Sequence, residues 1–142
     1  MPTRTSSAEW QGDLKGGSGK LALGSGAFSG AYNFVSRFES GDQTNPEELL
    51  GAAHAGCFSM SLSNLLAQEG TPATSVRTEA AVTLETVDGA PTITKVVLTT
   101  VGSVPGIDEA TFLEKAEAAK DGCPVSKLFT GAEIELDATL SS

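Results

Sequence analysis

Residues 45–70, NPEELLGAAHAGCFSMSLSNLLAQEG, carry the strongest structural signal in the chain. Asn45 is a preferred N-cap residue, Pro46 suits the first helical position, and Glu48 stands three residues after the cap, in the capping-box position. Gly70 is a typical residue at the end of a helix. The pattern therefore predicts one long helix that begins after Asn45 and ends before Gly70.

This helix is apolar nearly all round, because no charged residue falls between Glu48 and Glu69. A stretch of that length could cross a bilayer. It is interrupted, however, by two glycines and by polar side chains, namely His54, Ser59, Ser61, Ser63, Asn64 and Gln68. Burial in the core of a protein or of a dimer explains such a helix more simply, and no membrane association is expected.

Three strands are expected before this helix. Residues 8–14 and 18–26 form a predicted hairpin around a glycine-rich turn. A third strand is expected over residues 31–38, where aromatic residues alternate with others and where Arg37 would point away from Phe38.

The chain after the long helix predicts further strands and two shorter helices. Val- and Thr-rich strands are expected at 74–87 and 91–104, an amphipathic helix at 109–121 after the cap Asp108, a short helix at 124–129, and a last strand at 132–140. Phe112, Leu113 and Ala116 form the expected apolar face of the amphipathic helix. This order of elements predicts an α+β fold in one domain covering residues 1–142.

Charge and composition exclude several classes of function. Eighteen acidic residues against nine basic ones give a net charge of -9 over 142 residues, and the basic residues form no cluster. Such a surface disfavours nucleic acid and anionic membranes as partners. One histidine and two cysteines are too few for a histidine-rich zinc site or a four-cysteine cluster, so no metal or cofactor is expected.

The number of cysteines and the first residues of the chain indicate the cellular compartment. Two cysteines are too few for a disulfide scaffold, and the opening MPTRTSSAEW lacks the apolar core of a signal peptide. We therefore expect a reducing cytoplasm.

Four residues are candidates for chemistry. Cys57 lies in the middle of the helix and alone would be interpreted as a small core residue. Cys123 precedes Pro124 at an expected helix start, where unpaired N–H groups and the helix dipole stabilise a thiolate. Arg37 suits a buried anionic partner, unless its side chain is simply solvated. Glu48 fits the capping role, which leaves Glu47 available for another function. Two cysteines without another plausible nucleophile favour thiol redox chemistry.

Several runs of residues resemble one known family. They are Arg37-Phe38-Glu39, the stretch from Thr44 to Met60, Val104-Pro105-Gly106-Ile107-Asp108 and Gly122-Cys123-Pro124-Val125-Ser126. In this order they resemble the osmotically inducible protein C (OsmC) family, which is related to the organic hydroperoxide resistance proteins. The resemblance implies an α+β fold with antiparallel sheets around a long buried central helix, assembled as an intertwined homodimer.

The resemblance also implies an activity. It implies a thiol-dependent peroxidase that reduces organic hydroperoxides, and hydrogen peroxide more weakly, in defence against oxidative or osmotic stress. By match to the family motif Cys57 would be the attacking cysteine, Cys123 the resolving cysteine that forms a disulfide with it, and Arg37 with Glu47 their polar partners. A small dithiol or a lipoyl-type reductant would restore the thiols.

Helix geometry raises a question about this site. Glu47 and Cys57 are separated by roughly 15 Å along an unbroken helix. Either the helix is broken, at Gly51 or Gly56, or the two residues of one site come from two subunits, which we favour. Helix-end electrostatics points to Cys123 as the more acidic thiol, whereas the resemblance assigns attack to Cys57, and we follow the resemblance.

The neighbouring apolar residues predict a substrate pocket walled by Phe38, Leu49, Phe58 and Met60. An organic hydroperoxide would gain roughly 0.8 kcal/mol per buried methylene there, which hydrogen peroxide would not. Two alternatives stay open: a non-catalytic protein that binds an apolar ligand and has inert core cysteines, and a disulfide oxidoreductase that acts on protein thiols.

Overall fold

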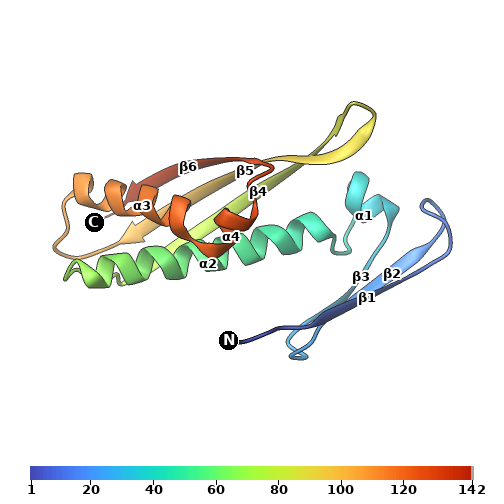
Figure 1. Ribbon diagram of the computed structural model, residues 1–142, viewed down its shortest axis with the longest axis horizontal. Coiled ribbons are helices and arrows are strands. Elements are labelled where there is room, and N and C mark those ends of the chain that lie inside the picture. Colours follow the sequence, from blue (N-terminus) through green and yellow to red (C-terminus); the bar gives the residue numbers. More distant parts are fainter. Residues whose placement is uncertain (142) are drawn as a thin grey trace. The chain divides into compact units, whose positions relative to one another are not determined.

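The computed structural model describes residues 1–141 (Figure 1). These residues separate into two compact units, Met1–Leu49 and the chain from Leu50 onward. The two units are described in turn, and a single domain over the whole chain stays a prediction. Both units mix helices with strands, so the predicted α+β class is confirmed.

The N-terminal unit contains a three-stranded antiparallel sheet of order β1-β2-β3, formed by β1 (Ser6–Gln11), β2 (Ser18–Leu23) and β3 (Ser29–Tyr32). The hairpin prediction is confirmed, although both of its strands are shorter than expected. Within residues 1–49, all of which the structure describes, no apolar side chain is completely buried. This unit therefore has no hydrophobic core of its own.

The predicted third strand is wrong in its second half. After β3 ends at Tyr32 the chain forms a short helix, α1 (Phe34–Phe38), so Arg37 lies on a helix and not on a strand. The physical reason is a capping box in which the Asn33 side chain accepts from the Ser36 N–H and the Ser36 hydroxyl accepts from the Asn33 N–H. This local pairing prevails over the alternating pattern of aromatic residues.

The long helix forms as predicted, as α2 (Pro46–Gln68). The Asn45 side chain caps it by accepting from the Glu48 N–H at 2.7 Å. The Glu48 carboxylate does not return to the cap, because it accepts instead from the Thr44 hydroxyl at 2.7 Å. The chain leaves the helix at Gly70, whose φ of 91° favours glycine. Since α2 runs without a break, the broken-helix alternative is wrong.

The second unit contains a mixed three-stranded sheet of order β4-β5-β6. Strands β4 (Ser75–Val87) and β5 (Ala90–Ser103) form the predicted antiparallel pair, and Asp88 and Gly89 adopt positive φ in the turn between them. Strand β6 (Glu133–Leu140) pairs parallel to β5, which departs from the expected antiparallel sheets. A parallel neighbour needs a crossover connection, and two helices provide it here.

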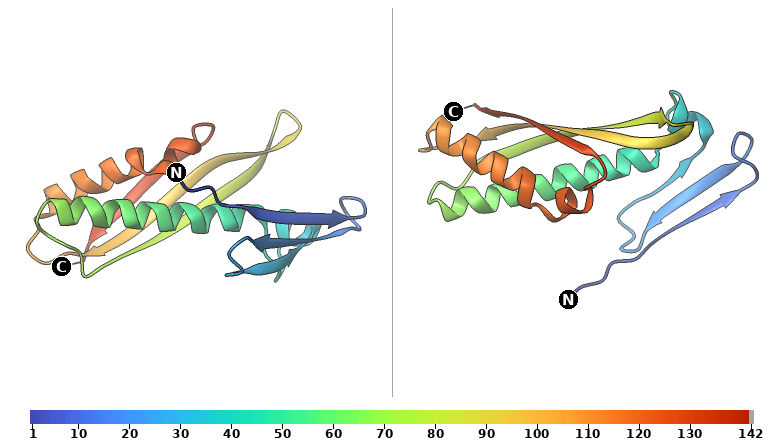
Figure 2. Two further views of the ribbon diagram at one scale, coloured as in Figure 1. Left: turned by 60° about the horizontal axis from the view of Figure 1, so that its bottom comes forward. Right: turned by 45° about the horizontal axis from the view of Figure 1, so that its top comes forward.

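These helices, α3 (Glu109–Gly122) and α4 (Pro124–Leu128), complete the second unit (Figure 2). The core lies between α2, α3 and the sheet and consists of Phe58, Leu62, Leu66, Val96, Leu98, Val104, Phe112, Ala116 and Ala119. Leu113, predicted on the buried face of α3, is 38% exposed, because that face is set by Phe112, Ala116 and Ala119 instead.

Helix α2 is buried on one side only within this chain. His54, Phe58, Leu62 and Leu66 are completely buried, whereas Ala52, Ala53, Gly56 and Met60 are exposed. By length and composition α2 could span a membrane, a property that core helices of globular proteins share. The burial of His54, Phe58, Leu62 and Leu66 is typical of a core helix. The opposite face of α2 is apolar but is not covered by this chain.

Candidate functional site

The two cysteines are free thiols that lie next to each other, although they stand at positions 57 and 123. Cys57 projects half-buried from α2, and Cys123 is completely buried at the N-cap of α4. The two thiols are close enough to shift each other's pKa, and a hydrogen bond from the Val125 backbone lowers the pKa of both.

The start of α4 surrounds Cys123 with hydrogen-bond partners from one residue. The Ser126 N–H donates to Cys123 Sγ at 3.3 Å, and the Cys123 thiol donates to Ser126 Oγ at 3.3 Å. Pro124 at the first helical position has no N–H to compete for the sulfur. The hydrogen bond from the Ser126 N–H is therefore the contact at this helix start that can stabilise a Cys123 thiolate.

The two thiols differ in acidity. Burial raises the pKa of Cys57, and the hydrogen bond from Val125 opposes this only in part. Burial acts to raise the pKa of Cys123 as well, but hydrogen bonds from Ser126, Cys57 and Val125 outweigh it and lower that pKa below its ordinary value. Within a single chain Cys123 is therefore the more acidic thiol, as its position before Pro124 predicts.

Arg37 and Glu47 form a bidentate ion pair in the N-terminal unit. Arg37 Nε donates to Glu47 Oε1 at 3.2 Å and Arg37 Nη2 donates to Glu47 Oε2 at 3.1 Å. Glu47 is buried, while the Arg37 side chain is 36% exposed. The carboxylate thus fixes the guanidinium by two donors and leaves Nη1 free for another anion.

The N-terminal unit also has an aromatic cavity that contains Arg37. A hollow of about 210 Å³ is lined by Trp10, Leu14, Tyr32, Asn33, Phe34, Arg37 and Phe38. The ring centroids of Trp10 and Tyr32 lie 5.3 Å apart with their planes tilted by 55°, and Arg37 lies over the Phe38 ring at 5.4 Å. Of the four predicted pocket residues, only Phe38 lines this cavity. Sequence reasoning missed Trp10 and Tyr32, although they are the only tryptophan and tyrosine of the chain.

The other three predicted pocket residues have different surroundings. Phe58 is completely buried in the core of the second unit, and its role as a pocket wall stays a prediction. The period of α2 turns it toward the sheet, together with Leu62. Met60 is 78% exposed on the uncovered face of α2, and Leu49 is half-buried.

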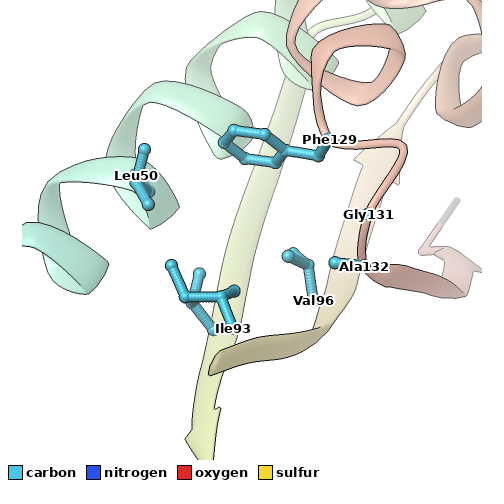
Figure 3. A pocket seen from close by; sticks show the side chains of 7 residues that line it. Leu50, Ile93, Val96, Phe129, Gly131 and Ala132 are labelled. Carbon is cyan, nitrogen blue, oxygen red and sulfur yellow. The ribbon is translucent and has the colours of Figure 1, made fainter. Parts of the chain in front are cut away.

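A second apolar cavity of about 190 Å³ lies in the second unit (Figure 3). Leu50 of α2, Val82 of β4, Ile93 and Val96 of β5, Phe129, Gly131 and Ala132 line it. Neither cysteine belongs to this lining. It is a hydrophobic hollow between the start of α2 and the sheet.

A long helix that carries one free thiol, next to a second free thiol at a helix start, defines an α+β protein with two neighbouring cysteines. The sequence profile described as OsmC-like protein matches residues 39–138. Peroxiredoxin OsmC of Escherichia coli (strain K12) is 48% identical over 136 residues, covering 95% of this chain and 94% of that protein. The chain therefore belongs to the OsmC-like protein family, as the motifs indicate.

Solved structures agree on the fold. The organic hydroperoxide resistance protein OhrB of Bacillus subtilis has a TM-score of 0.70 at 22% identity, covering 94% of this chain and 97% of that one. An OsmC-like protein from Mycoplasma pneumoniae has a TM-score of 0.75 at 14% identity, covering 99% of both chains. At these identities the likeness concerns the fold alone.

Proposed function

We propose that this chain reduces organic hydroperoxides, and hydrogen peroxide more weakly, with Cys57 as the attacking and Cys123 as the resolving cysteine. Membership of the family and 48% identity to a protein named peroxiredoxin make the chain a thiol peroxidase. The observation that supports the two-cysteine mechanism is that Cys57 and Cys123 are both free and lie close enough to shift each other's pKa. Inert core cysteines would not need to meet.

The proposed reaction has three steps. The Cys57 thiolate attacks the outer peroxide oxygen, the O–O bond breaks, the departing alkoxide takes up a proton to become the alcohol, and Cys57 becomes a sulfenic acid. Cys123 then condenses with this sulfenic acid, so that an S–S bond forms, the S–O bond breaks and water leaves. A small dithiol or lipoyl-type reductant returns both thiols by exchange and is itself oxidised to a disulfide.

The first step needs a cation near Cys57, since burial raises the pKa of that thiol within one chain. Arg37 suits this task, because a guanidinium stays charged when desolvated and because Glu47 already holds it in place. Glu47 and Cys57 lie roughly 15 Å apart along the unbroken helix. We therefore propose that Arg37 and Glu47 of one subunit serve Cys57 of the other subunit in an intertwined homodimer.

Two features of the single chain support this dimer. The outward face of α2 exposes Ala52, Ala53, Gly56 and Met60, an apolar surface that water disfavours. The N-terminal sheet has no buried apolar side chain, and such a sheet needs a packing partner to be stable. A symmetric dimer can cover both surfaces and yields two equivalent sites.

Subunit complementation tests the composite site. Arg37→Gln and Cys57→Ser chains, each inactive as homodimers, are mixed in equal amounts, dissociated and reassociated. In the heterodimer one site then combines an intact Arg37 with an intact Cys57, so about a quarter of wild-type activity should return. If both residues of a site come from one chain, the heterodimer has no intact site and the mixture stays inactive.

A coupled peroxidase assay tests the activity itself. Cumene hydroperoxide and hydrogen peroxide are compared with dithiothreitol and with dihydrolipoamide as reductants, and Cys57→Ser is the matched control. We expect a higher kcat/KM for cumene hydroperoxide, because the aromatic cavity beside Arg37 can bury its ring. Equal or better use of hydrogen peroxide contradicts this preference. No peroxide consumption, with Cys57→Ser altering stability alone, would support the apolar-ligand alternative.

We also propose a cellular location and a physiological role for this protein. Two free cysteines that must cycle through a disulfide and be reduced again suit a reducing cytoplasm. There the enzyme would remove organic peroxides under oxidative or osmotic stress. We also propose that residues 1–142 act as one domain, since neither of the two compact units would hold a complete site by itself.

A further inference from the structure

His54 is a buried group for which the mechanism above has no use. It is the only histidine of the chain, it lies on α2 three residues before Cys57, and it is completely buried. Its Nε2 lies 2.7 Å from Ser126 Oγ, and the Phe129 ring meets the imidazole edge-on at 5.3 Å. Among residues 1–141, its Nδ1 is the one buried side-chain polar atom without a hydrogen-bond partner. An unpaired buried polar atom costs free energy, so this histidine calls for a reason.

Ser126 connects this histidine to the cysteines. Its Oγ contacts His54 Nε2 at 2.7 Å and Cys123 Sγ at 3.3 Å, and its N–H also donates to that sulfur. Cys123 in turn lies next to Cys57, and the two thiols shift each other's pKa. Four neighbouring side chains therefore form a continuous row: Cys57, Cys123, Ser126 and His54.

We propose that Ser126 and His54 form a proton relay that activates Cys123 for its attack on the Cys57 sulfenic acid. The inference rests on the proposed function for the order of the two cysteines. Ser126 touches the reacting sulfur and is a catalytic residue, whereas His54 acts through Ser126 and is a positioning residue.

The relay moves one proton away from Cys123, through Ser126, to His54. As the Cys123 sulfur forms the S–S bond, its proton passes to Ser126 Oγ while the Ser126 proton passes to His54 Nε2. The S–O bond of Cys57 breaks, and the departing hydroxide takes a proton from water and leaves as water. His54 afterwards returns its proton to solvent, so the net reaction of one sulfenic acid and one thiol yields a disulfide and water. No oxidant beyond the peroxide is needed.

The surroundings of His54 suit this role. Burial lowers the pKa of His54, so the imidazole is neutral at pH 7 and can accept a proton. The charged side chains that share a surface cleft with Ser126 are Lys120, Asp121 and Lys127. Lys120 is paired with Glu117 and Asp121, which leaves Lys127 as the cation of this cleft without a recorded ion pair among residues 1–141.

Single-turnover kinetics of Ser126 variants tests the relay. Reduced protein is mixed with one equivalent of cumene hydroperoxide, and the Cys57 sulfenic acid is followed by trapping with dimedone and by mass spectrometry. In Ser126→Ala the sulfenic acid should form at the wild-type rate but condense at least roughly tenfold more slowly at pH 7, because the attacking thiol loses the group that accepts its proton. Condensation should recover above pH 9, where the thiol ionises unaided. Ser126→Thr, which keeps the hydroxyl, should behave as wild type.

Variants of His54 test its role as a positioning residue. His54→Phe removes the contact with Ser126 and should slow condensation at pH 7, whereas His54→Gln, which keeps a polar atom near the Nε2 position, should restore part of the rate. Thr100→Val is the matched control, because Thr100 is completely buried and its hydroxyl bonds only Thr78 and Arg77. That control should lose stability but not alter the pH profile of condensation.

A readout without peroxide separates the relay from the proposed function. In a Cys57→Ser background the Cys123 thiolate is titrated by its absorbance near 240 nm, and adding Ser126→Ala should shift the midpoint to higher pH. Unchanged condensation and an unchanged midpoint in Ser126→Ala overturn the relay. A shifted midpoint in a protein that consumes no peroxide would overturn the proposed function and leave the relay standing.

Discussion

Oxidation of the cysteine pair should stabilise the fold, and the size of the effect follows from the positions of the thiols. A Cys57–Cys123 bridge closes a loop of about 67 residues, for which the loss of unfolded-chain entropy gives about 4 kcal/mol at 25 °C. Native strain would subtract from this value. Because the two thiols already lie next to each other, we expect most of this stabilisation to be realised.

Urea unfolding measures this stabilisation. The reduced protein is treated with one equivalent of cumene hydroperoxide, and the oxidised and reduced forms are unfolded at the same protein concentration, because a dimer is stabilised by mass action. With a urea dependence of about 2 kcal/mol/M, the midpoint should rise by about 2 M. Non-reducing electrophoresis should show single chains, since the bridge lies within one subunit. The variants Cys57→Ser and Cys123→Ser, treated identically, should show no rise.

One result would refute the reasoning. If mass spectrometry shows the loss of two hydrogens and an intrachain bridge, yet the midpoint does not rise or falls, forming the bridge distorts the native chain. The sulfurs would then not be poised for bonding, and the second step of the proposed mechanism would need a conformational change. A bridge between chains would likewise contradict the placement of both cysteines in one unit.

Three further predictions concern other residues. Glu47→Gln should lower kcat/KM for cumene hydroperoxide about tenfold, because the amide cannot hold the Arg37 guanidinium by two charged contacts. Steady-state kinetics of the purified variant measures this loss of kcat/KM. Since burial lowers the pKa of His54, its stabilising contribution is present above pH 6.5 and is lost as the pH falls below it. Wild type should therefore lose up to about 1.4 kcal/mol per pH unit more than His54→Gln in urea titrations between pH 6.5 and 5. Met60→Glu should weaken the dimer by tenfold or more in analytical ultracentrifugation, whereas Leu128→Glu, at a similarly exposed apolar residue on α4, should not.

Short-range signals predicted most elements of this chain correctly. The cap at Asn45, the glycine at the end of α2 and the turn at Asp88 and Gly89 act over a few residues, so they can be recognised without knowing the fold. The same logic could have found α1, because Asn33 and Ser36 stand three residues apart in a capping-box spacing. Aromatic alternation obscured that signal.

Other features depend on distances that no local pattern encodes. The direction of β6 is decided by how α3 and α4 cross over the sheet, since a strand of the same sequence could pair in either direction. The face of α2 that becomes buried is likewise decided by the sheet beneath it, which is why Phe58 entered the core and Met60 did not.

The candidate site likewise combines features that the sequence predicts with features that only the tertiary structure determines. Residue types and motifs indicated thiol chemistry at Cys57 and Cys123, because few other side chains in this sequence could serve as nucleophiles. Only the tertiary structure brought α4 against α2, and this packing placed Ser126 between the sulfur of Cys123 and the imidazole of His54. The acidity of each thiol follows from that contact, since a pKa depends on burial and hydrogen bonds in three dimensions and not on neighbours along the chain.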